Sequence, residues 1–226
     1  MTDVAHEPGK SVNTGAQVLA AVLVVGGVLG GLWAHDEYVG TGDEREPAVC
    51  PAPHDSPSSR RVSGPRLCAA LNRPDLPSLL GTPQEYAETA DGDESSFDLA
   101  GGTRITTPEA TVTLTTYSVR LSASDDDLPV AGLTGILGAR AEERTILGHP
   151  AVLYSNRTIA IRFHGREADS GPGGIARGLV VARDPKDGGG TFEIAVWRQD
   201  DVPPDDAVLL RVAEKVLPTI PGWDAG

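Results

Sequence analysis

The longest apolar stretch of the chain covers residues 15–34, GAQVLAAVLVVGGVLGGLWA, which contain no charged side chain and one polar side chain, Gln17. Twenty residues in a helix match the thickness of the hydrocarbon core of a bilayer. The residues before this stretch carry two acidic groups and one basic group, and the stretch ends without the small-residue cleavage site of a signal peptide. We therefore predict an uncleaved single-pass transmembrane helix over residues 15–34, preceded by a cytoplasmic tail over residues 1–14.

Four glycines inside this stretch form two overlapping pairs of small residues at a spacing of four: Gly26, Gly27, Gly30 and Gly31. This spacing lets two membrane helices approach closely, and it predicts that the anchor can form a homodimer. Glycine is also common in membrane helices that have no partner, so the alternative of an unpaired anchor remains open.

Beyond the anchor the pattern changes to that of a stalk and a folded domain. Residues 35–65 are rich in Pro, Ser and charge and poor in large apolar side chains, which predicts a disordered stalk. Residues 66–72 predict a short helix, and residues 74–81 predict a second turn or helix that is closed by Gly81. Residues 88–101 are acidic and contain glycine, and they are interpreted as a loop.

A strand-like pattern follows, with Thr and Val enriched and apolar residues at alternate positions. It predicts strands over residues 111–121, 151–154, 158–163, 177–183 and 191–198. The last two are joined by DPKDGGG, a composition typical of a hairpin loop. Residues 128–137 fit either class, and a short helix is favoured there.

The clearest helix comes last. Asp205 or Asp206 can cap its first turn, and Pro218 ends it. Its apolar face repeats at spacings of three and four through Val208, Leu209, Val212, Ala213, Val216 and Leu217. Together these elements predict an α+β domain over residues 66–223, in which an antiparallel sheet is flanked by short N-terminal helices and a C-terminal helix.

The two cysteines decide which side of the membrane this domain occupies. Cys50 and Cys68 form an isolated pair with seventeen residues between them, which suits one disulfide in an oxidising compartment. A zinc site needs four ligands, and the sequence has no Cys-x-x-Cys or nearby His pair to supply them. Basic residues are nearly balanced on the two sides of the anchor, so the disulfide is the main reason to place the domain outside the cytoplasm.

Composition limits the partners. A hydrophobic content of 39% is enough for a core, and the net charge of −13 repels phosphate backbones and anionic lipid headgroups. Nucleic acid is therefore not expected as a partner. The acidity by itself indicates solubility and names no other partner.

Candidate chemistry is sparse. Ser155 with His149 is the one nucleophile–base pair that can be imagined, but the sequence has no G-x-S-x-G motif and no orienting acid. The glycine-rich residues 169–174 lack the Lys of a phosphate loop and are interpreted as a strand connection. Two aspartate clusters, residues 125–127 and residues 200–206, lack the alternate spacing of a calcium loop. No catalytic residue, cofactor or metal site is predicted.

Several motifs together resemble an uncharacterised family of actinobacterial single-pass membrane proteins. They are the anchor with its Pro-rich stalk, Leu67-Cys68-x-x-Leu71, Leu79-Leu80-Gly81, Gly148-His149-Pro150-Ala151, Thr158-Ile159-Ala160-Ile161 and the closing helix. Their order is also similar to that of mycobacterial envelope lipoproteins with a Mog1/PsbP-like sandwich, although a membrane helix replaces the lipidated cysteine. These resemblances imply a location and a fold and carry no catalytic residues.

Three functions follow as hypotheses. The first is a non-enzymatic docking module of the cell envelope that binds an envelope protein. The second is a carrier of a small apolar or lipid-like ligand in a gap between sheet and helix. The third is a hydrolase that uses His149 or His164.

Overall fold

The structure is a computed structural model that describes residues 46–52, 62–98, 104–125, 128–138, 140–164 and 167–224. These residues divide into two compact units. Ile159–Gly171, the tip of one hairpin, belongs to the first unit, and the remaining described residues belong to the second.

The predicted anchor and its four glycines lie outside the described residues, as does most of the predicted stalk. Among the described residues, no helix has both the length and the apolar character needed to cross a membrane. The transmembrane helix over residues 15–34 therefore stays a prediction.

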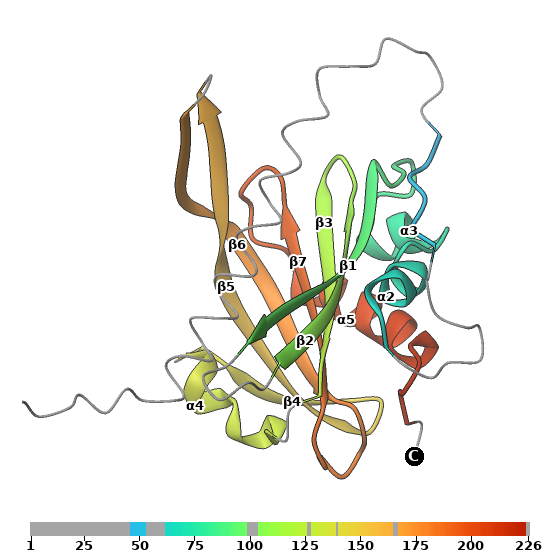
Figure 1. The fold of residues 1–226 in the computed structure, drawn as a ribbon, viewed down its shortest axis with the longest axis vertical. Helices are drawn as coiled ribbons and strands as arrows, with labels where there is room; N and C mark the ends of the chain where they lie inside the picture. Colours follow the sequence, from blue (N-terminus) through green and yellow to red (C-terminus); the bar gives the residue numbers. More distant parts are fainter. Residues whose placement is uncertain are drawn as a thin grey trace, which may run out of the picture. The chain divides into compact units, whose positions relative to one another are not determined.

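The described chain is built on one seven-stranded antiparallel sheet in the order β1-β2-β3-β7-β6-β5-β4 (Figure 1). The first three strands and the last four are each connected in sequence order, and β3 pairs with β7 in the middle of the sheet. The strands are β1 Thr89–Asp98, β2 Arg104–Thr113, β3 Tyr117–Ser124, β4 Glu142–Ile146, β5 His149–His164, β6 Glu167–Ala182 and β7 Thr191–Arg198.

The prediction of a loop over residues 88–101 is wrong, because Thr89–Asp98 forms the edge strand β1. It pairs with β2 over its whole length, from Thr89 opposite Thr113 to Asp98 opposite Arg104. In its first half Asp91 and Asp93 alternate with small residues, so these two charges lie on one face while Ala90 and Gly92 face the core. Charged side chains are common on edge strands because they discourage pairing with another chain.

The single strand predicted over residues 111–121 is two strands. β2 ends at Thr113 and β3 begins at Tyr117, and the turn between them is closed by the Leu114 N–H, which donates to the Tyr117 carbonyl at 2.7 Å. The buried apolar residues change from even positions in β2 to odd positions in β3, and this change of phase marks the turn.

Three further differences concern the other half of the sheet. The two strands predicted over residues 151–154 and 158–163 are parts of one long strand, β5. The glycine-rich residues 169–174, expected as a connection, lie within β6. The short edge strand β4 was not predicted, because four of its five residues are exposed and polar and give no apolar alternation. The β6–β7 hairpin itself is confirmed.

Three helices cover one face of the sheet, which we call the first face (Figure 1). They are α2 (Gly64–Leu71), α3 (Leu76–Leu80) and α5 (Asp206–Val216), all predicted from the sequence. Gly81 closes α3 with a φ of 86°, and the Asp205 carboxylate accepts the Ala207 N–H at 2.9 Å at the start of α5. Their apolar side chains pack on alternate residues of the strands to form the main core.

The connection from β3 to β4 crosses the opposite, second face of the sheet. It contains the 3-10 helix η3 (Val130–Gly132) and the short helix α4 (Thr134–Leu137), as favoured from the sequence. Asp187, in the β6–β7 loop, accepts the backbone N–H groups of Val130 and Ala131 at 2.9 and 3.1 Å. A small second core forms beneath the connection from Val130, Val152, Tyr154, Val180 and Ala182.

Candidate functional site

Charged and polar side chains gather on the second face of the sheet, beside the small second core. Strand alternation places them there, because their neighbours in sequence point into the main core. We call this set the Glu109 cluster; it consists of Asp91 and Asp93 on β1, Glu109 on β2, Arg120 on β3, Glu193 on β7 and Tyr154 on β5.

Tyr154 reaches the cluster by lying across β6. The side chain passes over Gly178, where a Cβ atom would overlap the tyrosine ring. The Tyr154 hydroxyl then donates to Glu193 Oε1 at 2.6 Å. Burial, followed by the nearby Glu193 carboxylate, raises the pKa of Tyr154 well above its usual value, so the phenol stays protonated and remains a donor.

Arg120 forms an ion pair with the same carboxylate. Its Nη2 lies 3.5 Å from Glu193 Oε1, and both side chains are 20% exposed. Burial acts to lower the pKa of Arg120, but the carboxylates of Glu193 and Glu109 outweigh it and raise the pKa. Glu193 is therefore satisfied by a cation on one side and by a phenol on the other.

One carboxyl oxygen of Glu109 has no hydrogen-bond partner. The residue is 3% exposed, and its Oε1 atom is buried without a hydrogen-bond partner. Burial raises the pKa of Glu109; Arg120 opposes this effect, while the carboxylates of Asp93 and Glu193 add to it. The arrangement thus disfavours the charged form of the one carboxyl group that lies deepest in the cluster.

The outer rim of the cluster is acidic. Asp93 lies directly opposite Glu109 in the β1–β2 register, and Asp91 lies opposite Thr111. Both aspartates are exposed. Burial of part of its side chain, with the charge of Asp93, raises the pKa of Asp91. The cluster therefore runs from an exposed acidic rim on the edge strand to a buried carboxyl on β2.

We expect Glu109→Gln to stabilise the protein at neutral pH. A buried charged group without a partner costs about 1–3 kcal/mol, and the amide is the neutral isostere. The pKa of Glu109 is raised in the folded state, so folding favours the protonated form of this side chain. The stability that this gives is fully present below the ordinary glutamate pKa, and it is lost as the pH rises through the folded-state pKa. The variant should thus match wild type in acid and exceed it by about 1 kcal/mol at pH 7 in urea unfolding.

Glu193→Gln is the matched control, because it removes the same charge from a carboxylate that is paired. We expect it to destabilise the protein at pH 7. If the two variants change stability in the same direction, the assignment of Glu109 as the unpaired member of the cluster is wrong.

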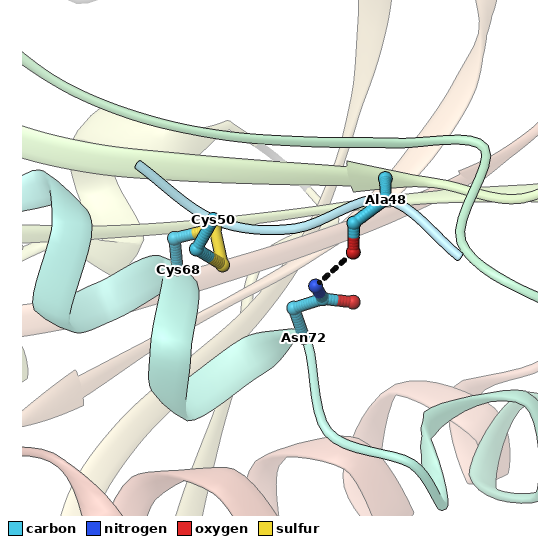
Figure 2. Close-up of a disulfide and its surroundings, with 4 residues drawn as sticks. All are labelled: Ala48, Cys50, Cys68 and Asn72. Atoms are coloured by element: carbon cyan, nitrogen blue, oxygen red, sulfur yellow. Dashed lines mark hydrogen bonds between the residues drawn. A yellow bond between two sulfur atoms is a disulfide. The ribbon is translucent and has the colours of Figure 1, made fainter. Parts of the chain in front are cut away.

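The disulfide that the sequence predicts is present between Cys50 and Cys68, with a Cα–Cα distance of 5.8 Å (Figure 2). It fastens the extended residues 46–52 to helix α2. Two hydrogen bonds of Ala48 hold the same segment: its N–H donates to the Ala87 carbonyl at 2.9 Å, and its carbonyl accepts Asn72 Nδ2 at 2.8 Å.

The structure does not bring Ser155 and His149 together. They lie six residues apart on β5, which corresponds to about 20 Å along a strand. Ser155 Oγ accepts a hydrogen bond from Arg177. His149 is fully buried, where Nδ1 lies 2.9 Å from the Ala182 carbonyl and the ring stacks on Trp223 at 3.9 Å. The side chain of His164 is not among those described.

Three described members of the aspartate clusters form ion pairs with arginines. Asp125 pairs with Arg183, Asp200 pairs with Arg198 at 2.5 Å, and Asp206 pairs with Arg177 at 2.5 Å. Among the described residues, no group of three His, Cys, Asp or Glu side chains is placed to hold a metal ion.

The interface between helix α5 and the sheet is filled by side chains. Leu209, Val212 and Val216 are fully buried on the helix, and Ile194 and Val196 are fully buried on β7. This is where the carrier hypothesis places its ligand. A surface hollow of about 410 Å³ lies elsewhere, lined partly by the charged side chains of Glu143 and Arg144. The carriage of an apolar ligand stays a hypothesis.

Comparison with known proteins gives a family without an assigned role. The model of a family of unknown function, DUF6215, matches residues 9–140, which is more than half of the chain. The chain belongs to this family. No curated protein and no solved structure matches it. Membership agrees with the expected uncharacterised family, while the likeness to Mog1/PsbP-like lipoproteins and an actinobacterial origin stay predictions.

Sequence reasoning missed the Glu109 cluster. Its members come from five strands, and the sequence separates them by as many as 102 positions, between Asp91 and Glu193. A local signal was present, since Glu109 and Arg120 each interrupt a run of Thr, Val, Ala and Leu at a position that faces away from the core. A charged residue inside a strand pattern identifies a candidate, but only the pairing of the strands identifies its neighbours.

Proposed function

We propose that this protein is a membrane-anchored docking module of the cell envelope. In this proposal its N-terminus lies in the cytoplasm, its folded domain lies outside, and it binds an envelope protein through the Glu109 cluster. The apolar residues 15–34 support the anchor. The Cys50–Cys68 disulfide supports an oxidising compartment.

The observation that carries the proposal is the buried, unpartnered carboxyl oxygen of Glu109. Buried polar groups in native proteins nearly always have a partner, because an unmade hydrogen bond costs stability. A carboxyl group that lowers the stability of the fold and has a perturbed pKa is a candidate functional residue. A binding partner that supplies the missing donor would recover this cost.

Docking fits the site better than hydrolysis does. A hydrolase requires a nucleophile within hydrogen-bond reach of a base, and Ser155 and His149 are far apart on one strand. In the Glu109 cluster the carboxylates of Asp93 and Glu109 belong to two neighbouring strands and face the same side of the sheet. Such a surface suits recognition of a complementary charge.

The test is site-specific photocrosslinking of the full-length chain in its host cells. A photoreactive amino acid at Thr111, which is half-buried beside Asp91 and Arg120 in the sheet register, should give a discrete protein adduct. The matched position is Glu214, which is exposed on α5 over the first face and should give none. The Thr111 adduct should disappear when Glu109 is also replaced by Gln.

An adduct that forms equally from both positions, or that survives Glu109→Gln unchanged, would show that the partner does not recognise the cluster. The absence of any adduct at Thr111 would contradict docking through this face.

A further inference from the structure

The charges of the Glu109 cluster do not balance. It contains four carboxyl groups, from Asp91, Asp93, Glu109 and Glu193, and one guanidinium, from Arg120. Arg120 is engaged with Glu193. Around Glu109, the attraction of Arg120 is opposed by Asp93 and by Glu193. An additional positive charge on this face would therefore be attracted by several groups at once.

The position of Asp93 sharpens this imbalance. It lies directly opposite Glu109 across the β1–β2 pair, and residues opposite each other on one face have Cβ atoms about 5 Å apart. Like charges at such positions destabilise a sheet. A donor group bound between the two carboxyl groups would turn this repulsion into two attractions.

The buried side chain of Glu109 also points to a missing group. Its Oε1 atom is buried, it faces the same side of the sheet as Asp93, and it has an unused capacity to accept a hydrogen bond. The acidic rim alone would indicate only a solvated surface. A buried acceptor without a donor behind that rim indicates that a donor is missing.

The side chains of the Glu109 cluster indicate which chemical group would bind there. A metal ion is not favoured, because the described residues hold no group of three side chains that could ligate one. Guanidinium and ammonium groups carry a positive charge together with several N–H donors, and they form charge-assisted hydrogen bonds with carboxylates. Such a group can donate to Glu109 and to Asp93 at the same time.

We infer that the Glu109 cluster binds an arginine or lysine side chain of a protein partner, with Glu109 as the buried acceptor and Asp91 and Asp93 as the rim. The inference rests on the proposed docking function, which makes a protein the source of the cation. Because β1 is an edge strand, an extended basic segment can approach the cluster past its two exposed aspartates. The partner's surface is therefore basic where it meets this face.

The experiment uses the full-length chain in detergent and a fluorescein-labelled peptide of alternating arginine and glycine, with binding followed by fluorescence anisotropy at pH 7.5 and low salt. Glu109→Gln should weaken binding at least tenfold, since it removes the acceptor charge. Glu214→Gln, which removes an equal charge from an exposed site on α5, should leave the affinity within twofold of wild type. A peptide with citrulline in place of arginine keeps the shape, lacks the charge and should not bind.

Asp93→Asn provides a second variant that keeps the buried residue intact, and it should weaken binding about threefold to tenfold. Affinity should also fall as the pH is lowered, because protonation of Glu109 removes the charge that holds the cation. Added salt should weaken binding to wild type more than binding to Glu109→Gln.

The inference is overturned if wild type does not bind the arginine peptide, if the citrulline peptide binds equally, or if Glu109→Gln and Glu214→Gln have the same affinity. It is also overturned if free spermidine displaces the peptide at a lower concentration than unlabelled peptide does, because the source of the cation would then be a polyamine. An adduct at Thr111 combined with no peptide binding would leave docking in place and remove only the basic partner.

Discussion

Replacing Cys50 and Cys68 together by serine is expected to lower the free energy of unfolding by about 3 kcal/mol. The disulfide restricts a loop of this size in the unfolded chain, and without the bond the unfolded state gains conformational entropy. The two residues are 18 positions apart, and the bond fastens residues 46–52 to helix α2 (Figure 2). Cys68 itself is fully buried in the main core, so a serine hydroxyl there adds to the loss. Urea unfolding of the full-length chain measures it.

Asn72→Ala is the graded control for this prediction. It removes the side chain that donates to the Ala48 carbonyl but leaves the disulfide closed, and it should cost about 1 kcal/mol. A double serine variant that loses no more stability than Asn72→Ala would mean that the bond contributes little to folding.

The disulfide also bears on location. Protein isolated from its host membranes without a reducing agent should show no reaction of either cysteine with a maleimide. If both cysteines react, the placement of the folded domain outside the cytoplasm loses its main support.

A second large effect is expected where helix α2 meets the edge strand. Gly92 faces the backbone of Gly64, and a Cβ atom on Gly92 would lie 2.5 Å from the Gly64 carbonyl oxygen and 2.9 Å from Cys68 Cβ. Neither the backbone of α2 nor the bonded cysteine can move away easily. Gly92→Ala should therefore reach the upper end of the usual cost of overpacking, about 3 kcal/mol.

Gly135→Ala is the matched substitution, because a Cβ atom at Gly135 in α4 meets nothing within 4 Å. It should leave stability unchanged or raise it by up to about 1 kcal/mol, since alanine favours a helix. Thermal unfolding followed by circular dichroism compares the two variants. Equal midpoints would show that α2 does not approach β1 as closely as the structure has it.

The sequence by itself was sufficient for elements whose signals are local. Helix α5 has an apolar repeat, a capping aspartate and a proline at its end, all within 14 residues, and it forms as predicted. The same is true of α3 with Gly81 and of the β6–β7 hairpin with its glycine-rich loop. The Cys50–Cys68 pairing was accessible because two cysteines allow only one bond.

The tertiary structure decided whatever depends on partners distant in sequence. The acidic composition of β1 predicts a loop. The segment is a strand because β2 supplies its hydrogen bonds and α2 covers its small residues. The turn at residues 114–116 is hidden because the residues on both sides of it share the same composition. The Glu109 cluster exists only because strand pairing brings charges from β1, β2, β3, β5 and β7 onto one face. The pKa shifts of the cluster depend on that assembled face, because the burial and the mutual repulsion that cause them are absent from the separate segments.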